Sequence, residues 1–150
     1  MARLVELTGS GPDAVNRSSP DGFQPLGLAA YFGQTEAALY LIDHGADLNS
    51  HSQNPQRVAP LHSAASSNSL AITSALIARG ANVNARQQGG YTALHAAVQN
   101  GSVEMVRLLV RNGADCMARN DAGQTPKEVA NRKNAEEVDT LLAACVKRTA

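Results

Sequence analysis

The sequence repeats itself at a period of 33 to 35 residues, and this restricts the chain to folds built from stacked copies of one short unit. A three-residue phrase recurs in steps of 35, 33 and 33 residues, as PLG, PLH, ALH and PKE beginning at positions 25, 60, 93 and 126. A second phrase recurs in steps of 35 and 33 residues, as HGADLN, RGANVN and NGADCM. Two separate markers with the same spacing establish the repeat.

Each copy is typical of two helices separated by a break. A turn that contains Gly leads into a short Ala-rich segment such as GLAAYFG or HAAVQNG, which ends at a Gly or Asn. Apolar residues at helical spacing follow, and a glycine and a short extended tail such as ADLN or ANVN complete the copy. Because neither helix can bury its apolar face alone, the copies must stack and share a continuous core.

The core of this stack has to be built from small aliphatic residues, because aromatic residues make up only 3% of the chain. Pairs of alanines at 29–30, 64–65 and 96–97 allow neighbouring helices to approach closely. The pattern predicts helices at residues 26–32, 36–43, 61–67, 70–78, 94–99, 103–111, 127–132 and 135–145.

These phrases resemble the ankyrin repeat, a unit of about 33 residues that carries a T-P-L-H-x-A phrase. The best matches are GYTALHAA at 90–97 and PLHSAA at 60–65, and the resemblance covers about residues 19–145. The resemblance implies an all-α solenoid of paired antiparallel helices with β-hairpin-like fingers on one side. It also implies a concave surface that binds other proteins.

The repeat divides the chain into parts of one ankyrin-repeat domain covering residues 1–150. We predict an N-terminal half-repeat at 1–18, repeats at 19–51, 52–86 and 87–119, and a C-terminal capping repeat at 120–150. In the half-repeat, LVEL at 4–7 would be a helix and residues 14–16 an extended tail. Either the chain starts with this half-unit as a cap or an upstream portion has been lost. If an upstream portion has been lost, an apolar edge is exposed at the N-terminal end. The chain is then expected to be a monomer or to self-associate weakly through this edge.

Two histidines in the repeated phrase, His62 and His95, are candidates for a catalytic or a structural role. Thr92 and His95 lie at positions i and i+3, where they can hydrogen-bond across the start of a helix and tie neighbouring fingers together. In the preceding copy Ala59 replaces the threonine, so His62 needs another partner. The chain has no HExxH, CxxC or GxSxG motif and no glycine-rich phosphate loop. We therefore predict structural histidines, with no metal, cofactor or catalytic residue.

Charge, hydrophobicity and cysteine content limit the partners and the cellular location that we expect for the chain. Thirteen Lys and Arg residues balance 13 Asp and Glu residues, which does not favour nucleic acid or an anionic membrane as a partner. No apolar run approaches the roughly 18 residues needed to span a bilayer. Cys116 and Cys145 show no disulfide framework, so a cytoplasmic, reducing location is expected, with Cys116 as a small core residue.

A protein partner is expected to contact the finger tips and the outward side of the first helices. The predicted binding residues are Phe23, Tyr31, Phe32, Gln56, Val58, Ser66, Ser67, Tyr91, Gln99, Asn100 and Arg132. Four of the five aromatic residues fall in this set, and aromatic side chains are favoured interface anchors. Two interpretations stay open: an aromatic binding patch, or a fold in which Phe23 and Phe32 turn back to cover the N-terminal end.

Two extra residues between Asn49 and Pro60 should lengthen or bulge one finger. They can be a partner-specific protrusion or a tolerated insertion, since added loop length costs little. The sequence thus predicts a non-catalytic protein–protein interaction module. The alternatives are an architectural spacer or regulatory domain of a longer protein, and an enzyme or small-molecule binder. The last would need an enclosed pocket with convergent ionisable groups.

Overall fold

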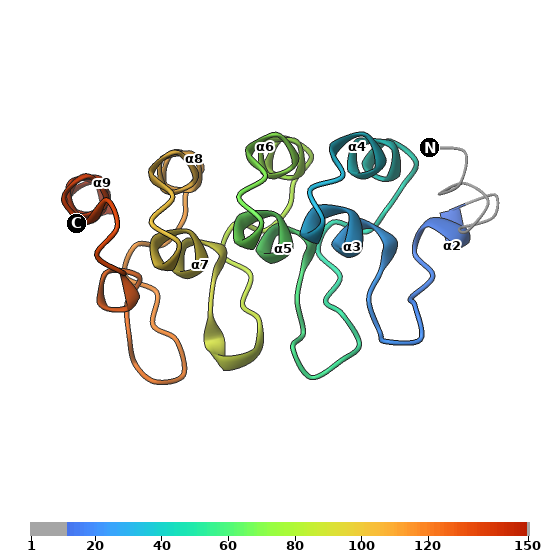
Figure 1. Ribbon diagram of the computed structural model, residues 1–150, viewed down its shortest axis with the longest axis horizontal. Coiled ribbons are helices and arrows are strands. Elements are labelled where there is room, and N and C mark those ends of the chain that lie inside the picture. Colours follow the sequence, from blue (N-terminus) through green and yellow to red (C-terminus); the bar gives the residue numbers. More distant parts are fainter. Residues whose placement is uncertain (1–11, 150) are drawn as a thin grey trace.

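The computed structural model describes residues 12–149 as a stack of helix pairs (Figure 1). One row holds the short helices α3 (Pro25–Tyr31), α5 (Pro60–Ser66) and α7 (Ala93–Gln99). A second row holds the longer helices α4 (Thr35–Asp43), α6 (Leu70–Ala78) and α8 (Val103–Arg111). Helix α9 (Ala135–Thr149) lies beside α8 at the C-terminal end, and the loops between pairs project from the helices as fingers.

Each finger is a loop whose base is closed by a backbone hydrogen bond. In finger 1 (residues 19–23) the Ser19 amide donates to the Phe23 carbonyl at 2.7 Å. Equivalent bonds close finger 2 (residues 52–58), finger 3 (residues 87–91, with the 3-10 turn η1, Gln88–Gly90) and finger 4 (residues 120–124). Residues 12–149 form no β-strand, so the fingers have the predicted hairpin shape without a β-ladder.

Neighbouring fingers are joined by single backbone hydrogen bonds. The amides of Gln53, Gln88 and Asp121 each donate to a carbonyl of the preceding finger, at 2.8 to 2.9 Å. Finger 2 is the longer one, because its base bond joins residues six positions apart where the other three join residues four apart. The predicted lengthening of one finger is therefore confirmed, and Arg57 completes the longer turn at a φ of 49°.

The core follows the repeat closely. Leucines and alanines of the short helices, such as Leu61 and Ala64, face leucines of the long row, such as Leu76, and all three are buried. The six helices predicted in the first three repeats are confirmed to within one residue at each end. Their apolar spacing and the Gly or Asn breaks between them are sufficient to locate them.

The prediction of a helix at residues 127–132 was wrong. Only a 3-10 turn, η2 (Lys127–Val129), forms there. The Asn131 side chain accepts a hydrogen bond from the Lys133 amide and donates one to the Gln99 carbonyl. Bonds of this kind compete with helical hydrogen bonds and end the helix early. Helix α9 in turn continues to Thr149, beyond the predicted end at residue 145.

The prediction of an extended tail at residues 14–16 was also wrong in part, because Pro12–Val15 forms a short helix, α2. Proline suits a first helical position, since its φ is already close to the helical value. The predicted helix at residues 4–7 lies outside the described residues. Asn16 nevertheless occupies the tail position of the repeat, where its side-chain oxygen accepts a hydrogen bond from the Asp47 amide at 2.8 Å.

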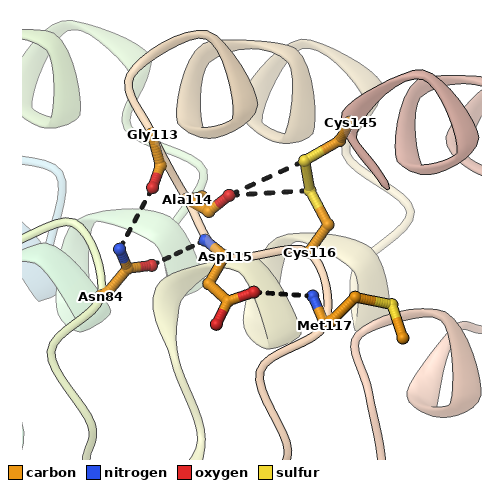
Figure 2. Close-up of a disulfide and its surroundings, with 7 residues drawn as sticks. All are labelled: Asn84, Gly113, Ala114, Asp115, Cys116, Met117 and Cys145. Carbon is orange, nitrogen blue, oxygen red and sulfur yellow. Dashed lines mark hydrogen bonds between the residues drawn. A yellow bond between two sulfur atoms is a disulfide. The ribbon is translucent and has the colours of Figure 1, made fainter. Parts of the chain in front are cut away.

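Asn16 begins a series of equivalent contacts that we call the asparagine ladder (Asn16, Asn49 and Asn84). The side-chain oxygen of each accepts a hydrogen bond from a backbone amide of the next tail, at 2.7 to 2.8 Å. Figure 2 shows the last step, where Asn84 bonds the Asp115 amide and the Gly113 carbonyl. The next tail carries Met117 where an asparagine would stand, and the ladder ends there.

Cys116 and Cys145 form a disulfide, so the prediction that these cysteines are unpaired was wrong (Figure 2). Both are buried, and Cys116 lies in the core as predicted. The two residues are 29 positions apart, and the packing of α9 on α8 brings their Cα atoms to 6.3 Å. The cysteines therefore no longer support a reducing compartment, and the cytoplasmic location stays a prediction without that argument.

Candidate functional site

His95 connects the start of α7 to finger 4. Its Nδ1 accepts a hydrogen bond from the Thr92 amide at 3.2 Å and lies 2.9 Å from the Thr92 hydroxyl. Its Nε2 then donates to the Gln124 carbonyl at 3.0 Å, in the next repeat. The ring is buried, and this burial lowers the pKa of His95, so that the neutral form is favoured.

His62 makes a similar connection one repeat earlier, from the start of α5 to the segment that leads into finger 3. The Ala59 amide donates to Nδ1 at 3.0 Å, as the Thr92 amide does for His95, and this bond serves without a threonine hydroxyl; Nε2 donates to the Ala85 carbonyl at 2.8 Å. Burial lowers the pKa of His62 to about 4. In both histidines the two ring nitrogens are occupied by the backbone, which leaves neither ring a free nitrogen for a metal ion or a proton transfer.

The first and fourth repeats lack this histidine and use other side chains. Gln24 donates to the Ser50 hydroxyl at 2.7 Å, across to the tail that leads into finger 2. The Glu128 carboxylate accepts a hydrogen bond from the Thr125 amide at 2.7 Å, as in a capping box, and this bond lowers the pKa of Glu128. These positions stabilise the repeat in all four copies.

The fingers and the short helices together form one surface, which we call the inner face. Tyr31 and Phe32, at the end of α3, have 60% and 66% of their surface exposed. Their ring centroids are 5.1 Å apart in an edge-to-face arrangement. Two adjacent aromatic rings exposed to this extent are uncommon on a surface that has no partner.

These rings border a hollow of about 470 Å³ on the inner face, which we call the aromatic hollow. Its lining residues are Phe23, Leu28, Tyr31, Phe32, Gln56, Val58, Ser63, Ser66 and Gln87. Six of the eleven predicted binding residues are brought together here. Leu28, Ser63 and Gln87 were missed, although Leu28 and Ser63 each precede a predicted residue, Tyr31 or Ser66, by three positions and so share its helix face.

The ends of the three short helices and the segment at the equivalent place in the fourth repeat form a second feature, the helix-end row. It consists of Tyr31 and Phe32, Ser66 and Ser67, Gln99 and Asn100, and Arg132 and Lys133. The Ser67 hydroxyl donates to the Ala30 carbonyl at 2.7 Å, and the Asn100 amide group donates to the Ser66 carbonyl at 3.3 Å. The bond from Asn131 to the Gln99 carbonyl adds the fourth repeat. The row therefore runs without interruption across all four repeats.

The comparison with known families agrees with this geometry. A family model described as ankyrin repeats matches residues 2–87 and 61–149, with three copies. The chain belongs to the ankyrin-repeat family. No curated protein matches the sequence. Ankyrin repeats are in general protein–protein interaction modules and are typically non-catalytic.

Within this ankyrin stack the remaining predicted residues have different surroundings. The Tyr91 ring lies edge-on to His95 at 5.6 Å, half-buried on finger 3 and outside the aromatic hollow. The side chains of Ser67 and Asn100 are engaged in bonds between repeats. Gln99 and Arg132 are exposed on the helix-end row.

The two phenylalanines of the first repeat differ in exposure, although both line the aromatic hollow. A second hollow of the ankyrin stack, about 550 Å³, lies on the N-terminal side of α3 and is lined in part by Phe23, Phe32 and Ala37. Phe23 is half-buried between the two hollows, in agreement with a covering role. Phe32 is mostly exposed, in agreement with a binding patch.

Between residues 12 and 149, no three His, Cys, Asp or Glu side chains are grouped so that they could hold a metal ion. Over the same residues, no helix is long and apolar enough to cross a bilayer.

Proposed function

We propose that this ankyrin-repeat chain binds a protein partner through its inner face and performs no chemistry on it. The observation that carries the proposal is the exposed pair Tyr31 and Phe32 at the edge of the aromatic hollow. Aromatic rings bury a large area on binding and lose little conformational entropy, which makes them effective anchors. The serine and glutamine side chains around the hollow supply hydrogen-bonding groups at its rim.

The connections between repeats support this role, because they hold the inner face in one shape before a partner arrives. Backbone bonds join neighbouring fingers, His95 joins α7 to the following repeat, and His62 joins α5 to the segment that leads into finger 3. A surface fixed in this way binds without the entropic cost of ordering loops.

The chemistry of the aromatic hollow also favours binding over catalysis. Tyr31 is the one ionisable residue among those that line it. A catalytic site needs several ionisable or nucleophilic groups that converge on one position.

Affinity capture from extracts of the source cell, quantified by mass spectrometry, tests the proposal. The test variant is the double change Tyr31→Ala and Phe32→Ala. The matched control is Leu39→Ala and Leu70→Ala, which removes two exposed apolar side chains from the long row, in α4 and α6. We expect a defined set of proteins to be captured by the wild type and the control, and to fall at least about tenfold with the test variant.

Equal capture by both variants would contradict binding through the inner face. A wild-type chain that captures no protein above background would instead favour the architectural spacer. In both cases circular dichroism of the purified variants establishes that the helices are retained.

A further inference from the structure

The helix-end row changes its chemistry from one end of the stack to the other. It begins with two aromatic side chains, Tyr31 and Phe32, and continues through the polar, uncharged pairs of the second and third repeats. It ends with two cations, Arg132 and Lys133, which are both exposed. One continuous strip of the inner face is thus apolar at its N-terminal end and positive at its C-terminal end.

The position of the last pair is fixed by the packing of the fourth repeat on α7. Gly101 follows the end of α7, and a Cβ atom added to it would lie 2.8 Å from the Lys133 carbonyl oxygen. The Asn134 side chain donates to the Gly101 carbonyl at 2.9 Å. The segment that carries Arg132 and Lys133 therefore lies directly against the end of the preceding short helix.

The two cations have no charged partner within the described chain. The ion pairs between residues 12 and 149 use four other arginines, namely Arg79, Arg86, Arg107 and Arg119. The nearest acidic residues in the sequence are Glu128, which pairs with Arg119, and Glu136 and Glu137 in the first turn of α9, for which the described residues show no ion pair.

We propose that the partner carries an extended segment with a large apolar side chain at one end and acidic residues at the other. This inference rests on the proposed function and identifies the chemistry of the partner. The apolar side chain enters the aromatic hollow beside Tyr31, and the acidic residues reach Arg132 and Lys133. Complementary charge of this kind fixes the direction in which the segment lies and speeds its association.

The middle of the row favours an extended segment over a helical one. The Ser66 hydroxyl and the Gln99 amide are exposed between the two ends. They can bond the free backbone groups of an extended chain, whereas a helix has already satisfied its own. Packed helices lie 8–10 Å apart, so three repeat steps cover about 27 Å, which an extended chain spans with about eight residues.

Peptide selection on the complete chain tests this inference. A displayed library of random twelve-residue peptides is selected against the immobilised wild type, and enriched peptides are measured by fluorescence anisotropy. We expect enriched sequences to combine a large apolar residue with at least two acidic residues about eight positions away. Tyr31→Ala with Phe32→Ala should weaken binding by about thirtyfold.

A charge swap distinguishes a direct contact from an indirect effect. Arg132→Glu with Lys133→Glu should weaken an enriched peptide by about tenfold at low salt, and this difference should shrink as salt is added. A peptide with Lys in place of its acidic residues should bind this variant and not the wild type. The matched control, Arg111→Glu with Arg148→Glu, reverses two exposed cations outside the inner face and should leave binding unchanged.

The outcomes separate the inference from the proposed function. Enriched peptides that depend on Tyr31 and Phe32 but lack acidic residues, or that ignore the charge swap, overturn the inference and leave inner-face binding intact. A library that yields no enriched peptide also overturns it, while protein capture is judged by its own experiment. Aromatic residues and cations can also bind single-stranded RNA. Binding of a uridine homopolymer that the charge swap abolishes, with no peptide enriched, would assign the row to nucleic acid instead.

Discussion

At the scale of single residues, the buried histidines are the most specialised side chains of the stack. His62 is 1% exposed, and its neutral ring accepts one backbone hydrogen bond through Nδ1 and donates another through Nε2. A proton on Nδ1 would turn this acceptor into a donor that faces the Ala59 amide, itself a donor. The charged ring is therefore disfavoured both by burial and by the loss of this bond.

Stability should fall on mild acidification because of His62. Its pKa is about 4 in the folded chain against 6.5 as the ordinary value, so the unfolded chain binds the proton more readily between these values. The contribution of the neutral His62 to the free energy of unfolding is fully present above pH 6.5 and is lost as the pH falls towards 4. At 1.36 kcal/mol per pKa unit, the loss in the free energy of unfolding reaches about 3 kcal/mol. Urea unfolding midpoints measured from pH 7 to pH 4 give this dependence.

His62→Gln is the control for this prediction. Glutamine keeps a side chain that can reach back to the backbone at the start of α5, but it does not titrate in this range. The variant should be less stable at pH 7 and should show a flatter pH dependence. Some dependence remains from His95, whose pKa burial also lowers. Identical pH dependence in both proteins would contradict the assignment to His62.

At the scale of the elements, the disulfide between Cys116 and Cys145 fixes helix α9 to the tail that follows α8. It closes a loop that spans 29 positions, and such a cross-link stabilises the folded chain by about 3 to 4 kcal/mol in the chain-entropy treatment. A reducing agent should therefore lower the unfolding midpoint. Hydrogen exchange should show that the loss of protection is largest in α9.

The double change Cys116→Ser and Cys145→Ser is the control, since its unfolding should not respond to the reducing agent. Alkylation of the unfolded, unreduced wild type, followed by mass measurement, should find no reactive thiol. Two alkylated cysteines in freshly purified protein, or an unfolding curve that the reducing agent leaves unchanged, would argue against the cross-link.

The helices of the first three repeats were predictable because their signals are local. Apolar residues at helical spacing and a Gly or Asn break are read from each copy separately, and Tyr31 and Phe32 followed from their place in the repeat. The end of the helix predicted at 127–132 depends on Asn131, whose side chain bonds both its own loop and the neighbouring repeat. The disulfide likewise depends on how α9 packs, which no spacing in the sequence records.

At the scale of the whole molecule, the N-terminal edge of the stack is where self-association is predicted. The second hollow, about 550 Å³, lies on this side of α3, and most of the residues that line it are apolar. Light scattering over a range of concentrations should show a weak shift from monomer towards dimer. Ala37→Lys, which places a charge in this hollow, should suppress the shift, and Leu70→Lys in α6 should not. A constant monomer mass at high concentration would refute the prediction.

The C-terminal end of the molecule limits the number of copies that can associate. Met117 takes the place of the asparagine that would bond a following copy, and α9 covers the last pair of helices. A filament grows only when the N-terminal edge of each molecule fits the C-terminal end of the next one. The C-terminal end has no asparagine side-chain oxygen at this position to accept a hydrogen bond from another molecule, so two molecules can pair through their N-terminal edges and leave no site for a third. At high concentration this protein should form dimers in solution and no fibres.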